Sequence, residues 1–242
     1  MNINFAIVTP MANEAADFEP FIDAVKQALD NIGLGKVYLV VDHASTDNTL
    51  DLCQELSSYD PRFITVWAPQ NKNVVDAYLR GYREAYGAGH DIIIEMDAGL
   101  SHDPAQLPGF IAQFKEGYEC VFGSRNIPGG SNADSPFTRR MLSKVGTLLA
   151  NLLLGTKLKD MTSGYQGFTR EVVGALLDYP LMSKAHFYQT ELRFLMRHRN
   201  WVEIPIRYRA PSPRVSRNAL KNSVQCLLHY TARRLRGKTD AL

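Results

Sequence analysis

Cysteine is scarce in this sequence, and no two cysteines are spaced as a redox or metal-binding motif. The 242 residues include only Cys53, Cys120 and Cys226, which are widely separated and form no Cys-x-x-Cys pair. This pattern excludes a disulfide framework and is typical of reduced, structural thiols in an intracellular protein.

Long hydrophobic runs are also missing. The longest candidate, residues 145–154, falls well short of the roughly 18 apolar residues that a membrane span requires. The first nine residues carry neither the basic region nor the cleavage site of a secretory leader. We therefore expect neither a transmembrane helix nor a leader. A content of 45% hydrophobic and 21% charged residues predicts a folded domain.

Acidic residues are sparse only in the last 50 residues. From Arg193 onward the chain has 12 lysines and arginines against two acids, whereas the first 192 residues have 15 against 23. The net charge of +2 therefore hides a basic tail on an acidic body. This asymmetry favours an anionic partner, such as a membrane surface, a nucleic acid or a phosphorylated substrate, although a solvated basic helix gives the same pattern.

From residue 4 to residue 122, short apolar strands alternate with amphipathic helices. Continuous apolar strands are typical of a parallel sheet that helices cover on both faces. We therefore predict an α/β fold with a mostly parallel central sheet. The predicted strands are 4–9, 36–41, 62–67, 91–96 and 118–122, and the predicted helices are 14–31, 47–56, 73–86 and a segment after residue 104.

The pattern changes after residue 123, but no repeat or low-complexity linker marks a domain boundary. We predict one domain over residues 1–242, made of a first part (1–122), a second part (123–210) and a basic C-terminal helix (211–242). Within the later parts we predict helices at 137–154, 187–199 and 215–236, and strands at 163–168 and 201–209.

Charged side chains follow three predicted strands where each strand ends. Asp42 and Asp97 come directly after strands, and Arg125 follows another within a few residues. In open α/β sheets, ligands bind beyond the carboxyl ends of the strands. Each aspartate alone would more often cap a turn, but together the three residues predict a site for an anionic, hydroxyl-rich ligand.

Seven segments in a fixed order carry a family likeness that spans nearly the whole chain. The chain resembles family 2 glycosyltransferases of the GT-A fold, and among them the dolichol- or polyprenyl-phosphate mannose synthase-like group. The stretch from GSR to TSG points to this lipid-phosphate group. The segments are VTPMANEA (8–15), VVDHASTDNT (40–49), MDAGLSHDP (96–104), FGSRNIPGG (122–130), RRMLSK (139–144), DMTSGYQGFTR (160–170) and EIPIRYR (203–209).

The resemblance implies that residues 1–122 bind a nucleotide-sugar donor, either GDP-mannose or a UDP-hexose. Thr9, Pro10, Asn13 and Glu14 would lie beside the nucleoside, and Asp42 would contact the base or the ribose.

Asp97 lies where the DxD motif of the family begins, which makes it a donor-binding, catalytic and metal-ligand candidate. The motif holds a divalent cation, Mg²⁺ or Mn²⁺, against the donor diphosphate, where the cation offsets the charge of the leaving group.

The chain departs from the family pattern at the motif itself, because Gly99 replaces the second carboxylate. Three explanations remain open. Asp97 can hold the metal with water, the diphosphate and Ser101, His102 or Asp103. Alternatively, arginines can neutralise the diphosphate without a metal, or the protein is a degenerate enzyme.

Two further departures lie elsewhere in the chain. His43 stands where the family usually has the second of two consecutive aspartates. Near the C-terminus, Ser216-Arg217 stands where the family often has a Ser-Lys pair, and we expect Arg217 to close over the donor phosphates.

The resemblance also implies that residues 123–210 bind the acceptor, a polyprenyl or dolichyl phosphate. Arg125 and Arg139 match positions that cradle the lipid phosphate, and Arg140 and Ser143 are weaker candidates. A phosphate is already an anion, so it needs cations rather than a general base, and the planar fork of arginine suits this role. The family implies direct displacement with inversion.

Two alternative functions remain open from the sequence. Transfer to a saccharide or protein hydroxyl would require a general base, for which Glu191 and Asp103 are the candidates. A non-catalytic nucleotide-sugar-binding protein would explain Gly99 and His43. We expect no nucleic-acid partner, because the tail shows no recognised motif and little aromatic interleaving.

A lipid acceptor implies contact with a membrane. The predicted helix 137–154 has an apolar face with basic residues at one end, and the final helix adds further basic residues. This combination is typical of peripheral binding to anionic lipid, although an apolar face can also turn to the core. We expect a cytoplasmic protein, peripheral to the cytoplasmic face of the membrane or aided by a membrane-anchored partner.

Overall fold

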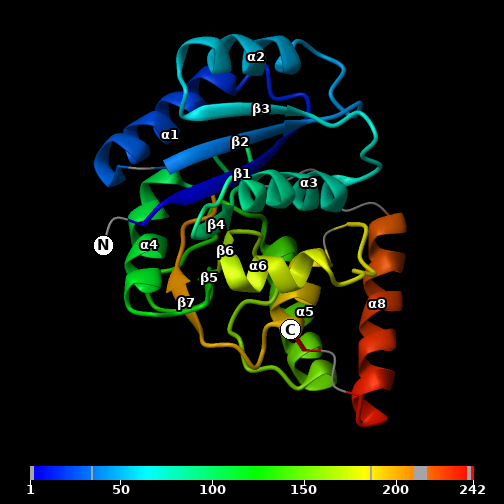
Figure 1. Ribbon diagram of the computed structural model, residues 1–242. Coiled ribbons are helices and arrows are strands. Elements are labelled where there is room, and N and C mark those ends of the chain that lie inside the picture. Colours follow the sequence, from blue (N-terminus) through cyan, green and yellow to red (C-terminus); the bar gives the residue numbers. More distant parts are fainter. Residues whose placement is uncertain (1–2, 34, 186, 210–216, 239–240) are drawn as a thin grey trace.

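A computed structural model describes residues 3–33, 35–185, 187–209, 217–238 and 241–242, and of Arg217 only the backbone. In these ranges seven strands form one sheet in the order β3-β2-β1-β4-β6-β5-β7 (Figure 1). Neighbouring strands are parallel except at β6, which is antiparallel to both β4 and β5. The strands are β1 (Phe5–Met11), β2 (Gly35–Val41), β3 (Phe63–Trp67), β4 (Ile92–Glu95), β5 (Cys120–Ser124), β6 (Gln166–Thr169) and β7 (Trp201–Pro205).

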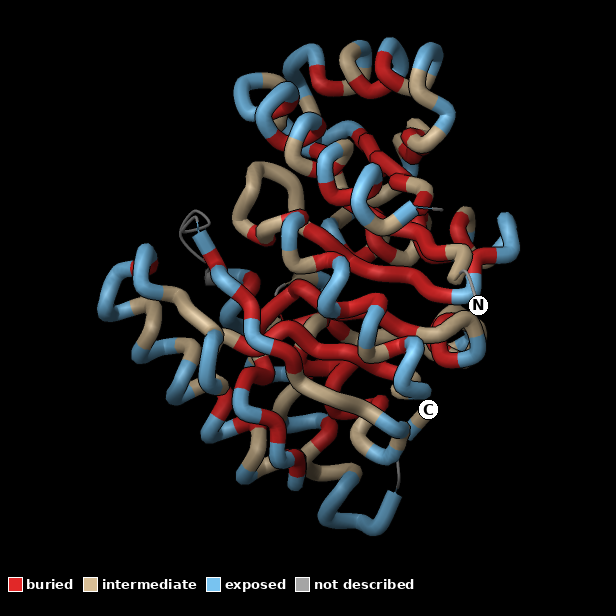
Figure 2. Tube along the Cα trace, turned by 90° about the vertical axis from the view of Figure 1, so that its left-hand side faces the viewer, coloured by how far each residue is buried: buried red, intermediate tan, exposed pale blue. Residues whose placement is uncertain are grey.

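Helices cover both faces of the sheet, each face with its own hydrophobic core. Helices α1, α2 and α4 pack on one face, and α3, α5, α6, α7 and α8 pack on the other. Figure 2 shows strands that are buried along most of their length and helices that alternate between buried and exposed residues. The helices are α1 (Phe18–Ile32), α2 (Thr49–Tyr59), α3 (Val74–Gly87), η1 (Pro104–Gln106), α4 (Leu107–Lys115), α5 (Phe137–Leu154), α6 (Arg170–Leu177), α7 (Tyr188–Leu195) and α8 (Arg217–Leu235).

The mostly parallel α/β sheet predicted from the sequence is confirmed, with differences at three helices and two strands. The predicted strand 201–209 ends at Pro205, and the predicted strand 163–168 begins only at Gln166. Helix α6 was not predicted. Helix α1 begins at Phe18 rather than at residue 14, because Asn13 has a left-handed backbone (φ 59°) and the following residues form a loop. Helix α7 ends at Leu195 rather than at residue 199, because the chain turns there to enter β7.

The apolar face of α5 is turned outward, so the core-facing alternative for this face is wrong. Leu148 is 68% exposed and Leu152 is 71% exposed. The residues of α5 that are buried are instead Thr147, Ala150 and Leu154. The other exposed apolar side chains of α5 are Phe137, Met141, Leu142, Val145 and Leu149, and those of the neighbouring α8 are Leu220, Val224, Leu228 and Leu235.

One basic residue of the C-terminal helix has a structural role. Arg234 of α8 donates hydrogen bonds to the carbonyl oxygens of Leu152 and Leu153 at the end of α5. The last carbonyls of a helix have no partner within the helix. The guanidinium of Arg234 therefore caps α5 and fastens the two helices together.

Candidate active site

The carboxyl ends of the parallel strands meet at one edge of the sheet. Asp42 follows β2, Asp97 follows β4, and Arg125 follows β5, so the topology brings the three predicted residues to the same edge. Two cavities open there, one beside β1 and β2 and the other between α5 and α8.

The first cavity, of about 370 Å³, is lined by the predicted donor residues Pro10 and Asp42. One oxygen of Asp42 accepts a hydrogen bond from the backbone N–H of Ala44, at 2.9 Å, so this side chain also closes a turn. Asn71 and Lys72 line the cavity as well and were not predicted. They lie in the loop between β3 and α3, where no periodic pattern distinguished them from other polar loop residues.

Two polar groups have unusual surroundings, one on Asn71 in the lining of this cavity and the other on Thr9 of β1. The Nδ2 atom of Asn71 and the hydroxyl of Thr9 are buried and lack a hydrogen-bond partner among the described residues. A buried polar group without a partner is costly, which is why such groups often mark ligand sites. His43 packs edge-on against the ring of Trp67 at the mouth of the cavity, with ring centroids 5.2 Å apart.

Three predicted donor residues are not part of the lining. Thr9, Asn13 and Glu14 are absent from the described residues that line the first cavity. Asn13 instead joins two loops: its Nδ2 donates to the carbonyl of Ala44 at 3.0 Å, and its Oδ1 accepts from the N–H of Thr46 at 2.9 Å. Asn13 therefore positions the loop after β1 and does not line the first cavity.

Asp97 lies just beyond the end of β4, on the wall of the second cavity. Its side chain is 39% exposed, and Oδ1 accepts a hydrogen bond from the hydroxyl of Tyr78 on α3. The backbone turns sharply after it, since Gly99 and Leu100 both have positive φ values of 68° and 60°. This turn leaves the carboxylate presented at the tip of the strand with one oxygen held in place.

The hydrogen bonding of His102 argues against its predicted role as a metal ligand. Its Nδ1 accepts a hydrogen bond from the backbone N–H of Asp97 at 3.0 Å, so that lone pair is occupied. Burial lowers the pKa of His102, which keeps the ring neutral with its proton on Nε2. Nε2 is therefore a donor, and it faces Asp97 Oδ2 at 3.7 Å.

Other contacts hold the segment after Asp97 in place. The ring of His102 stacks on Tyr165, with centroids 4.8 Å apart. Ser101, another predicted metal-ligand candidate, has its hydroxyl 3.4 Å from the carbonyl oxygen of Ala98.

The second cavity, of about 280 Å³, brings together the predicted catalytic and acceptor residues. Asp97, Arg125, Arg139 and Ser143 all line it, together with Arg140. The cavity continues between α5 and α8, where its wall becomes apolar. That part is lined by Leu142, Leu149, Ala150, Leu220, Val224 and Leu227.

Arg125 is paired with the buried acid Asp160, and this pair was not predicted from the sequence. Its Nε and Nη2 bind both oxygens of Asp160, at 2.7 and 2.8 Å, and Nη2 also donates to the hydroxyls of Ser143 and Thr162. Burial opposes ionisation of Asp160, but the bonds and charge of Arg125 hold its pKa well below the usual range. Asp160 and Thr162 belong to the DMTSG segment, so this motif was the one sequence feature that could have identified them as site residues.

This pairing changes the role expected for Arg125. Since its charge is offset by Asp160, Arg125 orients Ser143 and Thr162 at the cavity wall rather than offering an uncompensated cation. Arg139 and Arg140, in the first turn of α5, also line the cavity and carry the positive charge toward its polar end. The side chain of Arg217, which was predicted to close over the donor phosphates, lies outside the described residues.

Both candidate general bases are engaged in structural contacts. Glu191 is buried and accepts hydrogen bonds from the backbone N–H groups of Met182 and Ser183 and from the hydroxyl of Tyr230. Asp103 accepts from the N–H of Ala105 and pairs with Arg209. Neither carboxylate is therefore available as a base for a hydroxyl acceptor.

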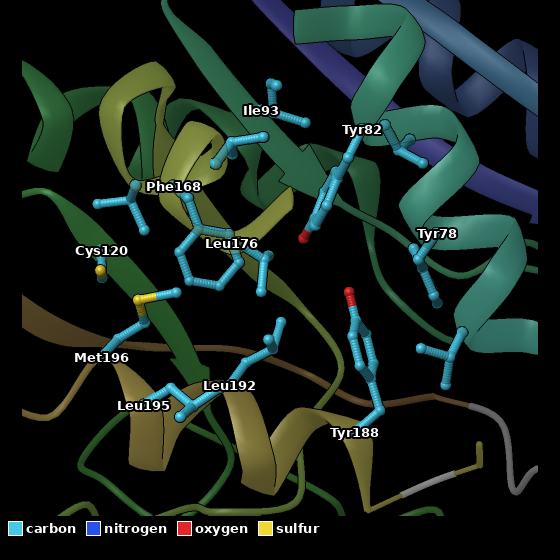
Figure 3. Close-up of a cluster of buried hydrophobic side chains, with 14 of the residues drawn as sticks. Tyr78, Tyr82, Ile93, Cys120, Phe168, Leu176, Tyr188, Leu192, Leu195 and Met196 are labelled. Atoms are coloured by element: carbon cyan, nitrogen blue, oxygen red, sulfur yellow. The ribbon is translucent and has the colours of Figure 1, made fainter. Parts of the chain in front are cut away.

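Another buried carboxylate, Glu95, lies two residues before Asp97. Its Oε1 accepts hydrogen bonds from the hydroxyls of Tyr82 and Tyr188, which point toward each other across the space between α3 and α7 (Figure 3). Its Oε2 accepts from Gln166 on β6, at 3.0 Å. Burial raises the pKa of Glu95 to about 7, against the opposing effect of these three donors.

The raised pKa predicts a pH-dependent difference in stability between the protein and the variant Glu95→Gln. A carboxyl group with a raised pKa stabilises the fold below its unfolded pKa, and this contribution is lost as pH rises through about 7. Between pH 4.5 and pH 8 the protein should lose about 3 kcal/mol relative to the variant. Urea unfolding of both proteins across this range measures the difference, and parallel curves would contradict the prediction.

The described residues contain neither a ready-made set of metal-ligating side chains nor a membrane-spanning helix. No group of three or more histidine, cysteine, aspartate or glutamate side chains in the described ranges is arranged to hold a metal ion. None of the helices described is both long enough and apolar enough to cross a bilayer.

A mostly parallel α/β sheet with a cavity beyond its strands and a carboxylate after β4 fits the architecture of a GT-A glycosyltransferase. The profile described as "Glycosyl transferase family 2" matches residues 6–177. The chain belongs to this family and is a glycosyltransferase.

Among known proteins, the chain is similar to two mannosyltransferases of the polyprenyl-phosphate group. The undecaprenyl-phosphate mannosyltransferase of Micrococcus luteus is 33% identical over 172 residues, which cover 70% of each chain. The polyprenol monophosphomannose synthase of Mycolicibacterium smegmatis is 29% identical over 237 residues, which cover 97% of this chain and 88% of that protein. These relatives and the family match identify a member of the polyprenyl-phosphate mannose synthase-like group.

Solved structures of one more distant enzyme share the fold. Glucosyl-3-phosphoglycerate synthase from Mycobacterium tuberculosis, in complex with Mn²⁺, uridine diphosphate and phosphoglyceric acid, superposes with a TM-score of 0.69 at 19% identity. The match covers 95% of this chain and 78% of that chain. Another structure of the same enzyme contains Mg²⁺ and uridine diphosphate.

Proposed function

We propose that this glycosyltransferase moves a hexosyl group from a nucleotide-sugar, GDP-mannose or a UDP-hexose, to the phosphate of a polyprenyl phosphate. The observation that carries the proposal is the second cavity, which is polar and cationic beside Asp97 and apolar between α5 and α8. A phosphate at the polar end and an isoprenoid chain at the apolar end match this change of lining. The mannosyltransferase relatives support the same acceptor class.

In the proposed reaction, a phosphate oxygen of the acceptor attacks the anomeric carbon of the sugar. The bond between that carbon and the donor diphosphate breaks, and the electron pair leaves with the nucleoside diphosphate. Direct displacement inverts the anomeric configuration. No proton has to be removed from an ionised phosphate, which fits the engagement of Glu191 and Asp103 in structural contacts.

The residues near Asp97 fit a divalent cation, Mg²⁺ or Mn²⁺. The partly exposed carboxylate of Asp97 and the hydroxyl of Ser101, four residues later, supply hard oxygen atoms, and Mg²⁺ commonly keeps several waters and few carboxylates. Bound there, the cation would offset the charge of the departing diphosphate. Arg139 and Arg140 would attract the acceptor phosphate, while Arg125 and Asp160 hold Ser143 and Thr162 at the wall.

The exposed apolar face of α5 supports a peripheral membrane location. Apolar side chains next to basic residues favour binding to anionic lipid, and here Arg139, Arg140 and Lys144 lie at the N-terminal end of that face. A bilayer or a membrane-anchored partner that covers this face would bring the lipid acceptor to the cavity mouth.

Charged substitutions on this face should weaken vesicle binding. Replacing both Leu148 and Leu152 with glutamate removes two exposed apolar side chains and adds charge that anionic lipid repels. We expect binding to vesicles that contain an anionic phospholipid to fall by more than about tenfold. Co-sedimentation measures the effect. The matched control is Tyr59→Glu on α2, which is 64% exposed on the opposite side of the sheet and should change little.

A transfer assay tests the proposed function. The protein is mixed with a polyprenyl phosphate in detergent and, separately, with GDP-mannose, UDP-glucose or UDP-N-acetylglucosamine, each with Mg²⁺, Mn²⁺ or EDTA. A sugar-linked lipid that forms with metal supports the proposal and identifies the donor. If no donor gives a lipid product while nucleotide still binds, the acceptor assignment is overturned in favour of a hydroxyl acceptor or a binding-only protein.

A further inference from the structure

The side chain of Glu14 lies beside the position where the DxD motif lacks its second carboxylate. A Cβ atom added at Gly99 would be 3.2 Å from Glu14 Oε2. Glu14 comes from the loop between β1 and α1, so it is distant from Gly99 in the sequence. The carboxylate of Glu14 therefore borders the space into which a side chain at position 99 would extend.

Glu14 reaches the turn that carries Asp97, since Gly99 lies only two residues after Asp97 in that turn. In the described part of the chain, neither carboxylate oxygen of Glu14 accepts a hydrogen bond, although its backbone N–H donates to Thr49 Oγ1 at 2.9 Å. Two neighbouring carboxylates that repel each other are stabilised by a cation between them.

A separate observation points to a bound anion beside Asp97. His102 is fully buried, and its Nε2 has no hydrogen-bond partner among the described residues. Nε2 carries a proton, since Nδ1 accepts from the N–H of Asp97, and His102 lines the second cavity together with Asp97. An unsatisfied donor beside the carboxylate of Asp97 suits a cation that arrives with a diphosphate, whose oxygens can accept from the ring.

We infer that Glu14 supplies the second carboxylate of the divalent-cation site, in place of the side chain that Gly99 lacks. The inference rests on the proposed use of a nucleoside diphosphate donor. It also gives a reason for the hydrogen bonds that hold this loop. Asn13 is bound to Ala44 and Thr46, and the N–H of Ala15 donates to Asp47 Oδ2 at 3.1 Å. These bonds fix the backbone on both sides of Glu14.

Binding of Mn²⁺, measured by the electron paramagnetic resonance signal of the free ion, tests the inference without any lipid acceptor. The titration is done with Mn²⁺ alone and with UDP or GDP present. Replacing Glu14 with glutamine should weaken Mn²⁺ affinity by about tenfold or more, since even outer-shell partners of metal sites contribute about 10- to 100-fold. Asp97→Asn should weaken it at least as much.

Two further variants separate ligation from a general effect of charge. Asp17→Asn removes another carboxylate that acts on Glu14 but is not a proposed ligand, so it should change affinity by less than about twofold. Adding Gly99→Asp to the Glu14→Gln variant should restore binding to within about threefold, because aspartate tolerates the positive φ at this position.

The outcomes distinguish the inference from the proposed function. If Asp97→Asn abolishes Mn²⁺ binding while Glu14→Gln binds normally, Glu14 is not a ligand, and the proposed function still stands. Equal losses in Glu14→Gln and Asp17→Asn, without rescue by Gly99→Asp, also overturn the inference. If the unmodified protein binds no Mn²⁺ with either nucleotide, both the inference and the metal-assisted reaction fail.

Discussion

Replacing Asp97 with asparagine should reduce sugar transfer by about a thousandfold or more while leaving the fold intact. Asp97 is the carboxylate that follows β4 and lines the second cavity, and in the proposed function it would hold the cation that offsets the charge of the departing diphosphate. Loss of one preorganised electrostatic contact to a developing charge typically costs about 10²- to 10³-fold in rate, and weaker cation binding adds to this. Initial rates of lipid-linked sugar formation measure the effect.

A conservative change beside Asp97 provides the matched control. Tyr78→Phe removes the hydroxyl that donates to Asp97 Oδ1 but keeps the carboxylate and the ring, which stacks on Tyr188. Its rate should fall by about tenfold, because Asp97 is then less firmly positioned. Circular dichroism and thermal unfolding show whether either variant is misfolded. Normal transfer by a folded Asp97→Asn protein would refute a role for this carboxylate in catalysis.

The second large effect is expected on stability, from Arg125→Met. Arg125 and Asp160 form a buried pair, and Asp160 is fully buried. Removing one partner leaves an uncompensated charge in the interior, which typically costs about 3–5 kcal/mol. Urea unfolding should show this loss, and transfer should fall as well because Ser143 and Thr162 lose the guanidinium that orients them.

A double variant tests whether the buried charge causes the loss. Asp160→Asn in the Arg125→Met background removes the stranded charge but keeps an oxygen that can accept from the backbone N–H of Thr162. We expect it to recover about 2 kcal/mol or more of the lost stability. No recovery would mean that Arg125 contributes through packing rather than through its pair with Asp160.

The strand order could not be predicted from periodicity, although the strands themselves could. Each strand is an apolar run bounded by turn residues, and that local pattern is enough to identify it. The insertion of β6 between β4 and β5 depends on pairing between residues far apart in sequence, such as Ile93 with Phe168 and Cys120 with Phe168. Helix α6 was missed because it follows β6 directly, without a loop to separate the two patterns.

The candidate site was predictable to the extent that motifs carried it. The residues Asp97, Arg125, Arg139 and Ser143 were predicted and line one cavity. Two contacts of this site were not predicted. Asp160 neutralises Arg125, and Glu14 lies beside Gly99. Such contacts join segments separated by many residues, so no local pattern contains them.

The antiparallel position of β6 has a consequence for how the chain is made. During synthesis from the N-terminus, β4 is complete at Glu95, but its partner β6 is not made until Thr169. Throughout that interval one edge of β4 has no strand beside it, and an open edge is a template for pairing with other chains. The nascent protein therefore passes through a stage in which β4 is an open edge strand, and only the return of the chain through β6 closes that edge.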